Sequence, residues 1–224
     1  MIKKSILCFG DSNTWGFVPG AFNPETFYME RYSSEIRWTG VMQKILGDQF
    51  YIIEEGLNGR TTNIEYPDLV GRSGTSYLPA CLYSHSPLDL VMVQLGVNDL
   101  KSLFDRKLKD IANGISDIIE IVQGSMFGSD MQSAPKILLV SPPELVHEGY
   151  IDADGELAFI GGLNKSKEFD NYFSEIAAKK NCHYIDLKPF VNYSSIDGIH
   201  LDENGHQKVG RILAKCVDDI FNND

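Results

Sequence analysis

A serine near the start of the chain and an Asp–His pair near its end are residue types that can together perform acyl transfer. Ser12 directly follows the apolar run of residues 5–9, and Asp197 and His200 are three positions apart close to the C-terminus. A serine hydroxyl becomes nucleophilic when a base removes its proton, and a carboxylate must orient that base. One turn can place Asp197 against one imidazole nitrogen of His200 while the other nitrogen faces Ser12. We therefore expect His200 to accept the serine proton and return it to the leaving group.

Acyl transfer also needs hydrogen-bond donors aimed at the charge that develops on the carbonyl oxygen. Gly59 follows a second apolar run, and its N–H can approach a substrate closely because glycine has no side chain. Asn98 follows a third apolar run and can offer its side-chain amide. Glycine, asparagine and aspartate are also common turn formers, and a lone loop histidine is usually structural. The hypothesis therefore depends on the combination of these residues.

The elements that must position these residues are apolar runs of strand length, which alternate with segments of helical period. The expected strands are residues 5–9, 50–54, 88–95, 136–141 and 183–187, and the expected helices are residues 36–46, 78–85, 108–123, 165–180 and 203–221. This alternation predicts an α/β fold with a doubly wound parallel sheet, in which ligands bind beyond the carboxyl ends of the strands. No linker divides the chain, so we expect residues 1–224 to form a single domain.

The long segments 10–35, 55–77 and 142–163 follow predicted strands and are expected to shape the site. Trp15, close to Ser12, either walls an acyl pocket or packs in the core. Arg60, next to Gly59, either contacts the substrate or is a solvated or salt-bridged side chain. Trp38 and His206 are expected to have structural roles.

Composition excludes several classes of function. The 224 residues carry a formal net charge of −11, which leaves no excess of Lys or Arg to bind nucleic acid. The cysteines (Cys8, Cys81, Cys182 and Cys216) form no Cys-x-x-Cys pair and no cluster with the histidines, so no metal site and no cofactor are expected. Residues 152–155 superficially match a calcium loop but lack its later ligands, so we expect a polar hairpin turn. No signal peptide or membrane span is recognisable, and a cytoplasmic location is expected.

Four short blocks resemble those of the SGNH hydrolases, also called GDSL esterases, and they occur in that family's order. They are Gly10-Asp11-Ser12-Asn13, Gly59, Gly96-Val97-Asn98-Asp99 and Asp197-Gly198-Ile199-His200. Further segments resemble the bacterial arylesterase/acyltransferase branch of the family: Arg37–Gly40, Glu54–Leu57, Arg60–Asn63, Ser76–Pro79, Pro87–Val91 and Val140–Pro143. The resemblance covers residue 5 to about residue 210.

The resemblance implies a flavodoxin-like three-layer sandwich with strand order 2-1-3-4-5 and helices on both faces, and an esterase without a metal. It implies that Ser12 is the nucleophile, His200 the general base and acid, and Asp197 the orienting carboxylate. The oxyanion donors would be the N–H groups of Ser12 and Gly59 and the amide of Asn98. Substrate contacts are assigned to Asp11, Trp15 and Arg60. The resemblance also implies a homo-oligomer whose interfaces narrow the site.

Two segments depart from the branch. Its members commonly carry Ser-Ala where this chain has Asn58-Gly59, although the wider family has glycine there. Residues 144–160 are more polar than the branch pattern, so the acyl or alcohol specificity stays open.

Three functions remain to be compared. The first is hydrolysis of small aryl or alkyl esters, with acyl transfer to alcohols as a further activity. The second is deacetylation of acetylated sugars. The third is a non-catalytic flavin- or phosphate-binding module, which the carboxylate of Asp11 disfavours because it would repel phosphate.

Overall fold

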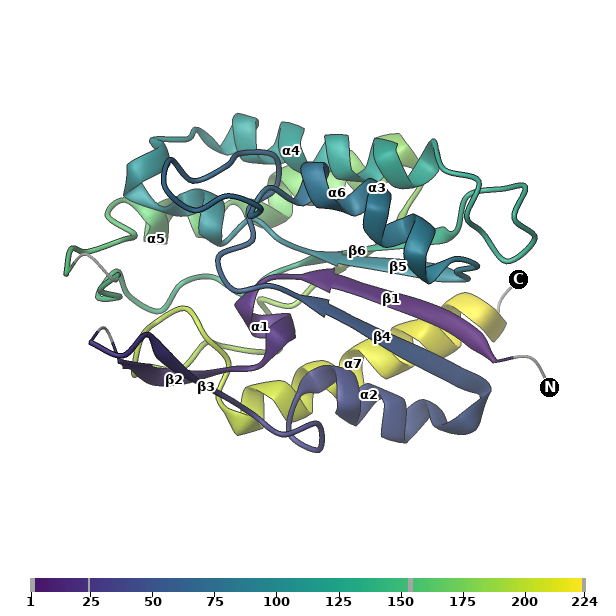
Figure 1. Ribbon diagram of the computed structural model, residues 1–224, viewed down its shortest axis with the longest axis horizontal. Coiled ribbons are helices and arrows are strands. Elements are labelled where there is room, and N and C mark those ends of the chain that lie inside the picture. The colour runs from purple at the N-terminus through teal and green to yellow at the C-terminus, as the bar shows by residue number, and fades with distance from the viewer. Residues whose placement is uncertain (1–2, 24, 153–154, 223–224) are drawn as a thin grey trace.

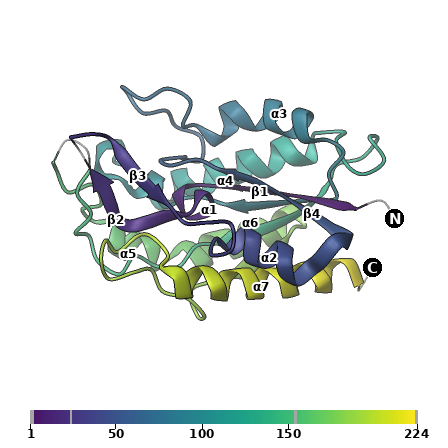
Figure 2. The same cartoon turned by 60° about the horizontal axis from the view of Figure 1, so that its bottom comes forward.

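A five-stranded parallel sheet forms the centre of the computed structural model, which describes residues 3–23, 25–152 and 155–222 (Figures 1 and 2). Across the sheet the strands are β4 (Phe50–Gly56), β1 (Lys4–Gly10), β5 (Leu90–Gln94), β6 (Lys136–Ser141) and β7 (His183–Asp186). Counted along the chain this is the predicted order 2-1-3-4-5, and every pairing is parallel. All five predicted strands are confirmed, with ends that shift by at most two residues.

Helices cover both faces of the sheet, as expected for a doubly wound fold. One layer holds α2 (Trp38–Leu46) and α7 (Glu203–Asn222), and the other holds α3 (Gly74–His85), α4 (Leu108–Gln123) and α6 (Phe169–Lys180) (Figure 1). In the described part of the chain, no helix is both long and apolar enough to cross a membrane.

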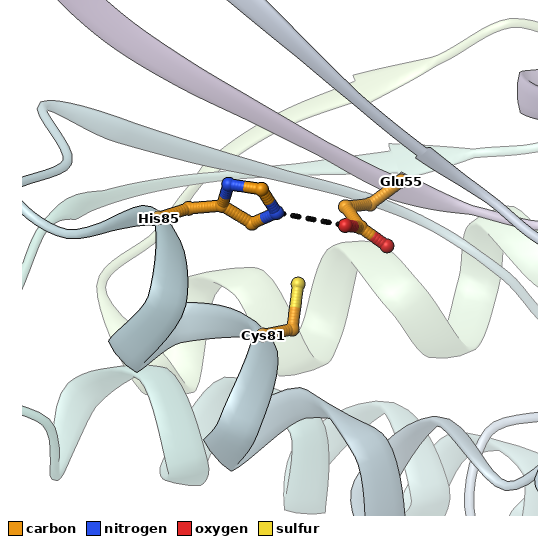
Figure 3. Close-up of side chains that lie close together, drawn as sticks. All are labelled: Glu55, Cys81 and His85. Carbon is orange, nitrogen blue, oxygen red and sulfur yellow. Dashed lines mark hydrogen bonds and ion pairs between the residues drawn. The ribbon is translucent and has the colours of Figure 1, made fainter.

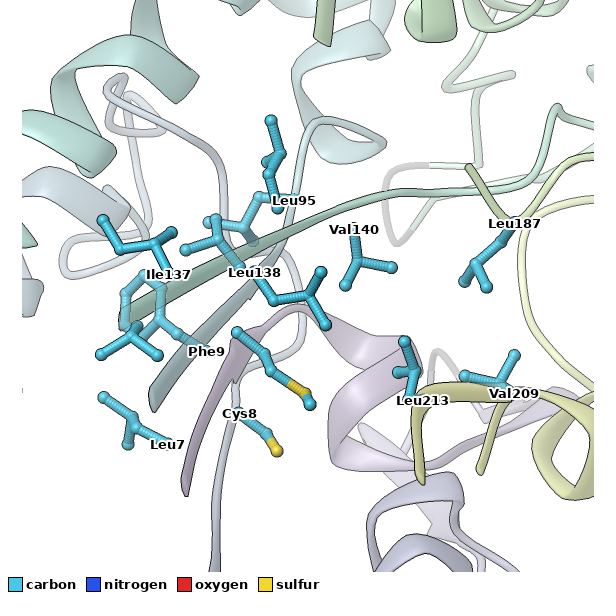
Figure 4. Packing of buried hydrophobic residues seen from close by; sticks show 14 of the residues in the cluster. Leu7, Cys8, Phe9, Leu95, Ile137, Leu138, Val140, Leu187, Val209 and Leu213 are labelled. Atoms are coloured by element: carbon cyan, nitrogen blue, oxygen red, sulfur yellow. The ribbon is translucent and has the colours of Figure 1, made fainter. Parts of the chain in front are cut away.

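The core lies between the sheet and these layers. Every residue of β5 is buried, which explains why its sequence is almost continuously apolar. Val209 and Leu213 of α7 point toward the sheet, where Leu138 and Val140 of β6 lie close by (Figure 4). Full burial of an aliphatic side chain of this size contributes about 1.5–3 kcal/mol, so this packing fixes the strand ends that carry the site.

The predicted helix over residues 165–180 is wrong in extent. The structure divides it into α5 (Gly162–Ser166) and α6. The buried hydroxyl of Ser166 donates to the Leu163 carbonyl at 2.8 Å and accepts a hydrogen bond from the Leu145 N–H at 3.0 Å. The chain is thus tied to the segment that follows β6 at the point where the helix breaks.

The segment 10–35, predicted as a loop, contains structure of its own. It holds α1 (Ser12–Trp15) and an antiparallel pair, β2 (Phe17–Asn23) and β3 (Tyr28–Arg31). Short 3-10 turns occur at Gly47–Gln49, Asn98–Leu100 and Ser102–Phe104. Figure 1 shows α1, the β2–β3 pair and α5 at the carboxyl end of the sheet, while both chain termini lie at the opposite end.

Candidate active site

Ser12 lies where β1 passes directly into α1. The side chain of Asp11 caps this helix by accepting a hydrogen bond from the Asn13 backbone N–H at 2.9 Å. A Cβ on Gly10 would lie 2.1 Å from the Thr14 hydroxyl oxygen, so glycine is what lets the chain turn at once from strand to helix. The Ser12 side chain is thereby held at the sheet edge, where it lines a cavity.

Ser12, His200 and Asp197 form a continuous chain of polar contacts. His200 Nε2 lies 2.9 Å from Ser12 Oγ, and His200 Nδ1 lies 2.8 Å from Asp197 Oδ2. The other carboxylate oxygen of Asp197 accepts the backbone N–H groups of Ile199 at 3.2 Å and His200 at 3.1 Å. The turn that follows Asp197 therefore fixes the carboxylate and the imidazole together, as the spacing predicts.

The charge of Asp197 is maintained in this buried place. Burial opposes ionisation, but hydrogen bonds from the His200 side chain and from the backbone N–H groups of Ile199 and His200 more than offset it, so the pKa of Asp197 lies below its ordinary value. A carboxylate that stays charged stabilises the imidazolium formed when a histidine takes up a serine proton.

Asn13 joins the two halves of this arrangement. Its side-chain amide donates to the Ile199 carbonyl at 3.1 Å and accepts the Leu201 N–H at 2.9 Å. These bonds bracket His200 and attach its loop to the helix that carries Ser12. Asn13 is 2 % exposed, so both bonds are shielded from water.

Two aromatic rings contact the imidazole. The ring of Phe17 stacks on His200 with centroids 4.3 Å apart, and Tyr150 meets His200 edge-on at 5.9 Å. Burial raises the pKa of the Tyr150 phenol, so its hydroxyl stays neutral. These rings fix the plane of the imidazole and limit the access of water to it.

The three expected oxyanion donors lie beside the same cavity as Ser12. Among the described residues, none accepts a hydrogen bond from the backbone N–H of Ser12 or Gly59. Asn98 Nδ2 donates to the Arg60 carbonyl at 3.1 Å, which leaves its second N–H available. Gly59 has φ +78°, a conformation that favours glycine. The arrangement thus offers unpaired donors at the edge of the cavity.

The cavity has a volume of about 640 Å³ and two unlike walls. Its apolar wall comes mainly from the β2–β3 region: Phe17, Phe22, Phe27, Met29 and Ile199. Its polar wall comes from the segments after β4 and β5 and from the segment after β6: Asn58, Tyr66, Asp68, Arg72, Lys101 and Asp152. Residues of all three long segments, 10–35, 55–77 and 142–163, therefore line the pocket, as expected.

Asp11, Trp15 and Arg60, which were assigned to substrate contacts, are not among the residues that line this cavity. Asp11 is used as the helix cap, and burial raises its pKa to about 6. The Trp15 ring is half-buried under the Arg31 guanidinium, 5.1 Å from its centroid.

The third of these residues, Arg60, is buried. Its guanidinium donates to the Gly10 carbonyl at 2.9 Å and to the Glu55 carbonyl, and it lies 4.2 Å from the centroid of the Phe9 ring. It is also 3.9 Å from the Glu55 carboxylate, so the salt-bridged interpretation holds. Arg60 therefore joins the carboxyl ends of β1 and β4.

The expectation that the cysteines form no cluster with the histidines is wrong at one place. Cys81 and His85, four residues apart on α3, lie with Glu55 of β4 so that one ligand atom from each is within 4.8 Å of the others (Figure 3). These are residue types that bind zinc. Glu55 is already engaged by His85 Nε2 at 2.8 Å and by Arg60, and burial raises the pKa of the Cys81 thiol to about 12. A metal ion would have to displace the guanidinium and deprotonate this thiol, so the trio fits a packing contact between α3 and β4 better than an ion site.

The other structural expectations can be compared directly. Trp38 and His206 are buried, and His206 Nδ1 accepts the Trp38 backbone N–H at 3.3 Å. The predicted turn at 152–155 includes residues 153–154, which lie outside the described residues. At its ends Ile151 pairs with Leu157 in an antiparallel bridge, consistent with a hairpin. Asp152 forms an ion pair with Lys101.

Sequence reasoning missed Asn13 and the residues that wall the cavity. Asn13 belongs to the Gly10–Asn13 block, so its position beside Ser12 was a usable signal. The sequence around Phe17, Tyr66, Arg72 and Tyr150 carries no local pattern, because these residues meet only through the folding of separate loops.

Comparisons with known proteins agree with this geometry. A family model described as the GDSL-like lipase/acylhydrolase family matches residues 8–208. No curated protein matches the chain.

Several solved structures resemble the chain over nearly its whole length. Est24, a carbohydrate acetylesterase from Sinorhizobium meliloti, is 39% identical, with 97% of this chain and 100% of that chain covered and a TM-score of 0.89. The aryl esterase of M. smegmatis is 40% identical, with coverages of 96% and 99% and a TM-score of 0.88. A carbohydrate acetylesterase family member from Sinorhizobium meliloti is 33% identical, with coverages of 96% and 97% and a TM-score of 0.84.

Proposed function

The chain belongs to the GDSL-like lipase/acylhydrolase family and is a carboxylic ester hydrolase, and from this premise we propose that Ser12 is the nucleophile of the reaction. One observation carries the proposal: Asp197, His200 and Ser12 are joined by contacts of 2.8 and 2.9 Å. This is the geometry that a base-activated serine needs.

In the first half of the reaction, Ser12 Oγ attacks the ester carbonyl while its proton passes to His200 Nε2. The negative charge that develops on the carbonyl oxygen is stabilised by the N–H groups of Ser12 and Gly59 and by the Asn98 amide. When the tetrahedral intermediate collapses, the bond to the alcohol oxygen breaks and His200 protonates the departing alcohol. The acyl group is left as an ester on Ser12.

In the second half, His200 takes a proton from water, and the resulting hydroxyl attacks the acyl-enzyme. The carboxylic acid leaves and Ser12 recovers its proton. An alcohol that replaces water at this step yields a new ester, and the apolar wall formed by Phe17, Phe22 and Phe27 supports this acyl transfer because it favours alcohols over water.

Two substrate classes fit the cavity. Aryl and alkyl esters match the apolar wall, and the resemblance to an M. smegmatis aryl esterase supports them. Acetylated sugars match the polar wall, and the resemblance to carbohydrate acetylesterases supports them. Both classes carry a small acyl group, and they differ in the alcohol part of the ester.

The test of this proposal is hydrolysis of p-nitrophenyl acetate by Ser12→Ala. We expect kcat to fall by about 10⁴-fold or more, because the nucleophile is removed while the fold stays intact. Ser84→Ala, at an exposed position on α3, is the matched control and should keep full activity. Wild-type activity in Ser12→Ala would contradict the proposal.

Assembly with a second copy of the chain stays a prediction. Large apolar side chains at the mouth of the cavity support it, with Phe27 68% and Leu69 45% exposed. Light scattering of the purified protein measures the oligomeric state directly. The alternative of a non-catalytic flavin or phosphate module is not supported, since the family is one of hydrolases.

A further inference from the structure

Two of the proposed oxyanion donors, Gly59 and Asn98, come from different strands of the sheet. Gly59 follows β4 and Asn98 follows β5, and each of these strands pairs with β1 between them. Both donors lie beyond the ends of their strands, so the distance between them depends on contacts between the two loops. One such contact is the hydrogen bond from Asn98 Nδ2 to the Arg60 carbonyl at 3.1 Å.

A buried carboxylate next to Asn98 makes a second connection between these loops. Asp99 Oδ2 accepts the backbone N–H of Thr62 at 2.9 Å, and Asp99 Oδ1 accepts the Thr62 hydroxyl at 2.6 Å. Both residues are 0% exposed, so water does not compete for these bonds. The loop of Asn98 is therefore tied to the loop of Gly59 by two hydrogen bonds to one side chain.

Arg106 neutralises this carboxylate and fixes its orientation. The guanidinium forms an ion pair with Asp99 Oδ1, and it also donates to the Thr62 hydroxyl at 3.1 Å and to Asn63 Oδ1 at 2.7 Å. A planar guanidinium that binds several acceptors at once holds each of them in one geometry. Burial raises the pKa of Asp99 to about 6, and hydrogen bonds from Thr62 and the charge of Arg106 limit this rise, so the carboxylate is charged at pH 8.

The helix packed against these residues leaves room for them. A Cβ on Gly114 of α4 would lie 2.1 Å from Thr62 Oγ1, so a larger residue at this position would displace the hydroxyl. The Arg106 carbonyl accepts a hydrogen bond from Lys165 Nζ at 2.8 Å, which ties its backbone to α5. Asp99, Thr62 and Arg106, which we name the Asp99 network, are thus held in place from more than one element.

The residues of the Asp99 network are not among those that line the cavity, whereas Gly59 and Asn98 are. The network can therefore influence a substrate in the cavity only through the residues that it holds. Oxyanion donors act when they lie about 2.7–3.1 Å from the developing charge, and misplacement by about 1 Å can cost on the order of 100-fold in rate.

We propose that the Asp99 network sets the spacing between the Gly59 N–H and the Asn98 amide, which makes Asp99, Thr62 and Arg106 positioning residues of the oxyanion hole. This inference rests on the proposed function, since it concerns the donors of that same reaction. It assigns to a buried ion pair outside the cavity a role in the chemical step.

The first experiment breaks the ion pair with Arg106→Met and measures hydrolysis of p-nitrophenyl acetate at pH 8. We expect kcat to fall by about 10- to 100-fold while KM changes by less than about twofold, because the donors are displaced and the cavity wall is not. Arg211→Met, at an exposed position on α7, is the matched control and should change neither parameter.

The second experiment separates positioning from a general loss of structure by repeating Arg106→Met in the Asn98→Ala variant. Once Asn98 has lost its amide, the spacing between the two donors no longer matters, so Arg106→Met should now lower kcat by less than about threefold. A general loss of structure would lower kcat by the same factor in both backgrounds. Equal factors would therefore overturn the proposal.

Thr62 supplies a milder change and its own conservative variant. Thr62→Val removes the hydroxyl that Asp99 accepts, and we expect kcat to fall by about fivefold, whereas Thr62→Ser restores the hydroxyl and should bring kcat to within about twofold of the wild type. If Arg106→Met does not fold, Thr62→Val replaces it in the comparison with Asn98→Ala.

Wild-type kcat in folded Arg106→Met, or in Thr62→Val where that variant replaces it, would overturn the proposal. Failure of the proposed function gives a different result, because Ser12→Ala would then hydrolyse p-nitrophenyl acetate at the wild-type rate.

Discussion

Asn13 provides a test of how the two ends of the chain are joined in the active site. The variant Asn13→Ala leaves the Ile199 carbonyl and the Leu201 N–H without their side-chain partner in a place shielded from water. An unpaired buried group costs about 1–3 kcal/mol, so the two together should lower the free energy of unfolding by about 3 kcal/mol. Urea denaturation measures this loss.

The same change should damage catalysis more than substrate binding. Asn13 does not line the cavity, but its bonds hold the loop of His200 against the helix of Ser12. Misplacement of a catalytic group by about 1 Å can cost on the order of 100-fold in rate, so we expect kcat for p-nitrophenyl acetate to fall by about 10- to 100-fold with little change in KM.

The matched control is Asn171→Ala, which removes an exposed asparagine of α6 whose side chain binds Glu168. It should change neither kcat nor, by more than about 0.5 kcal/mol, the free energy of unfolding. If folded Asn13→Ala keeps the wild-type kcat, the hydrogen bonds of Asn13 to Ile199 and Leu201 are not needed to position His200, which would contradict this prediction.

Three other predictions concern single residues. Asn98→Ala should lower kcat by about 10²–10³-fold with a smaller change in KM, because it removes an oxyanion donor. A rise in KM by the same factor as the fall in kcat would contradict that role. Burial lowers the pKa of His206 to about 4, so its neutral form is favoured in the folded state. The contribution of neutral His206 to the free energy of unfolding is therefore complete above pH 6.5 and falls by about 3 kcal/mol as the pH drops to 4, because the unfolded chain takes up a proton first. Urea denaturation of His206→Asn at a series of pH values should lack this loss. Arg60→Met should lower the free energy of unfolding by about 3 kcal/mol, because Glu55 loses a buried partner; Arg211→Met, which is exposed, serves as its control.

The centre of the sheet could be predicted from the sequence because β1, β5 and β6 are buried over most of their length and therefore read as apolar runs. The β2–β3 pair could not, since all residues of β3 are exposed and show no alternation. The break between α5 and α6 is set by a contact of Ser166 with Leu145, 21 residues away, which local helical period cannot reveal.

The candidate catalytic residues could be predicted because they fall in short blocks with fixed order. The cavity wall could not, since Tyr66, Lys101 and Tyr150 come together only in the fold. Arg60 and Trp15 are each close to a site residue in sequence, yet Arg60 binds Gly10 and Glu55 and Trp15 packs against Arg31, and neither lines the cavity. Cys81 and His85 are four residues apart in a predicted helix, so their proximity could be predicted from the sequence. The approach of Glu55 from β4 could not, because it depends on the packing of α3 against the sheet.

The central claim is that the acyl group passes through Ser12, and mass spectrometry of the enzyme quenched during turnover of p-nitrophenyl acetate tests it most directly. We predict that an acetyl group is found on the peptide that contains Ser12, and that it is absent from Ser12→Ala. Deacetylation should be slower in His200→Ala, because the base that activates water is missing. An acetyl group trapped on another residue would contradict the account. So would wild-type enzyme that releases a burst of p-nitrophenol and yet carries no acetyl group on Ser12.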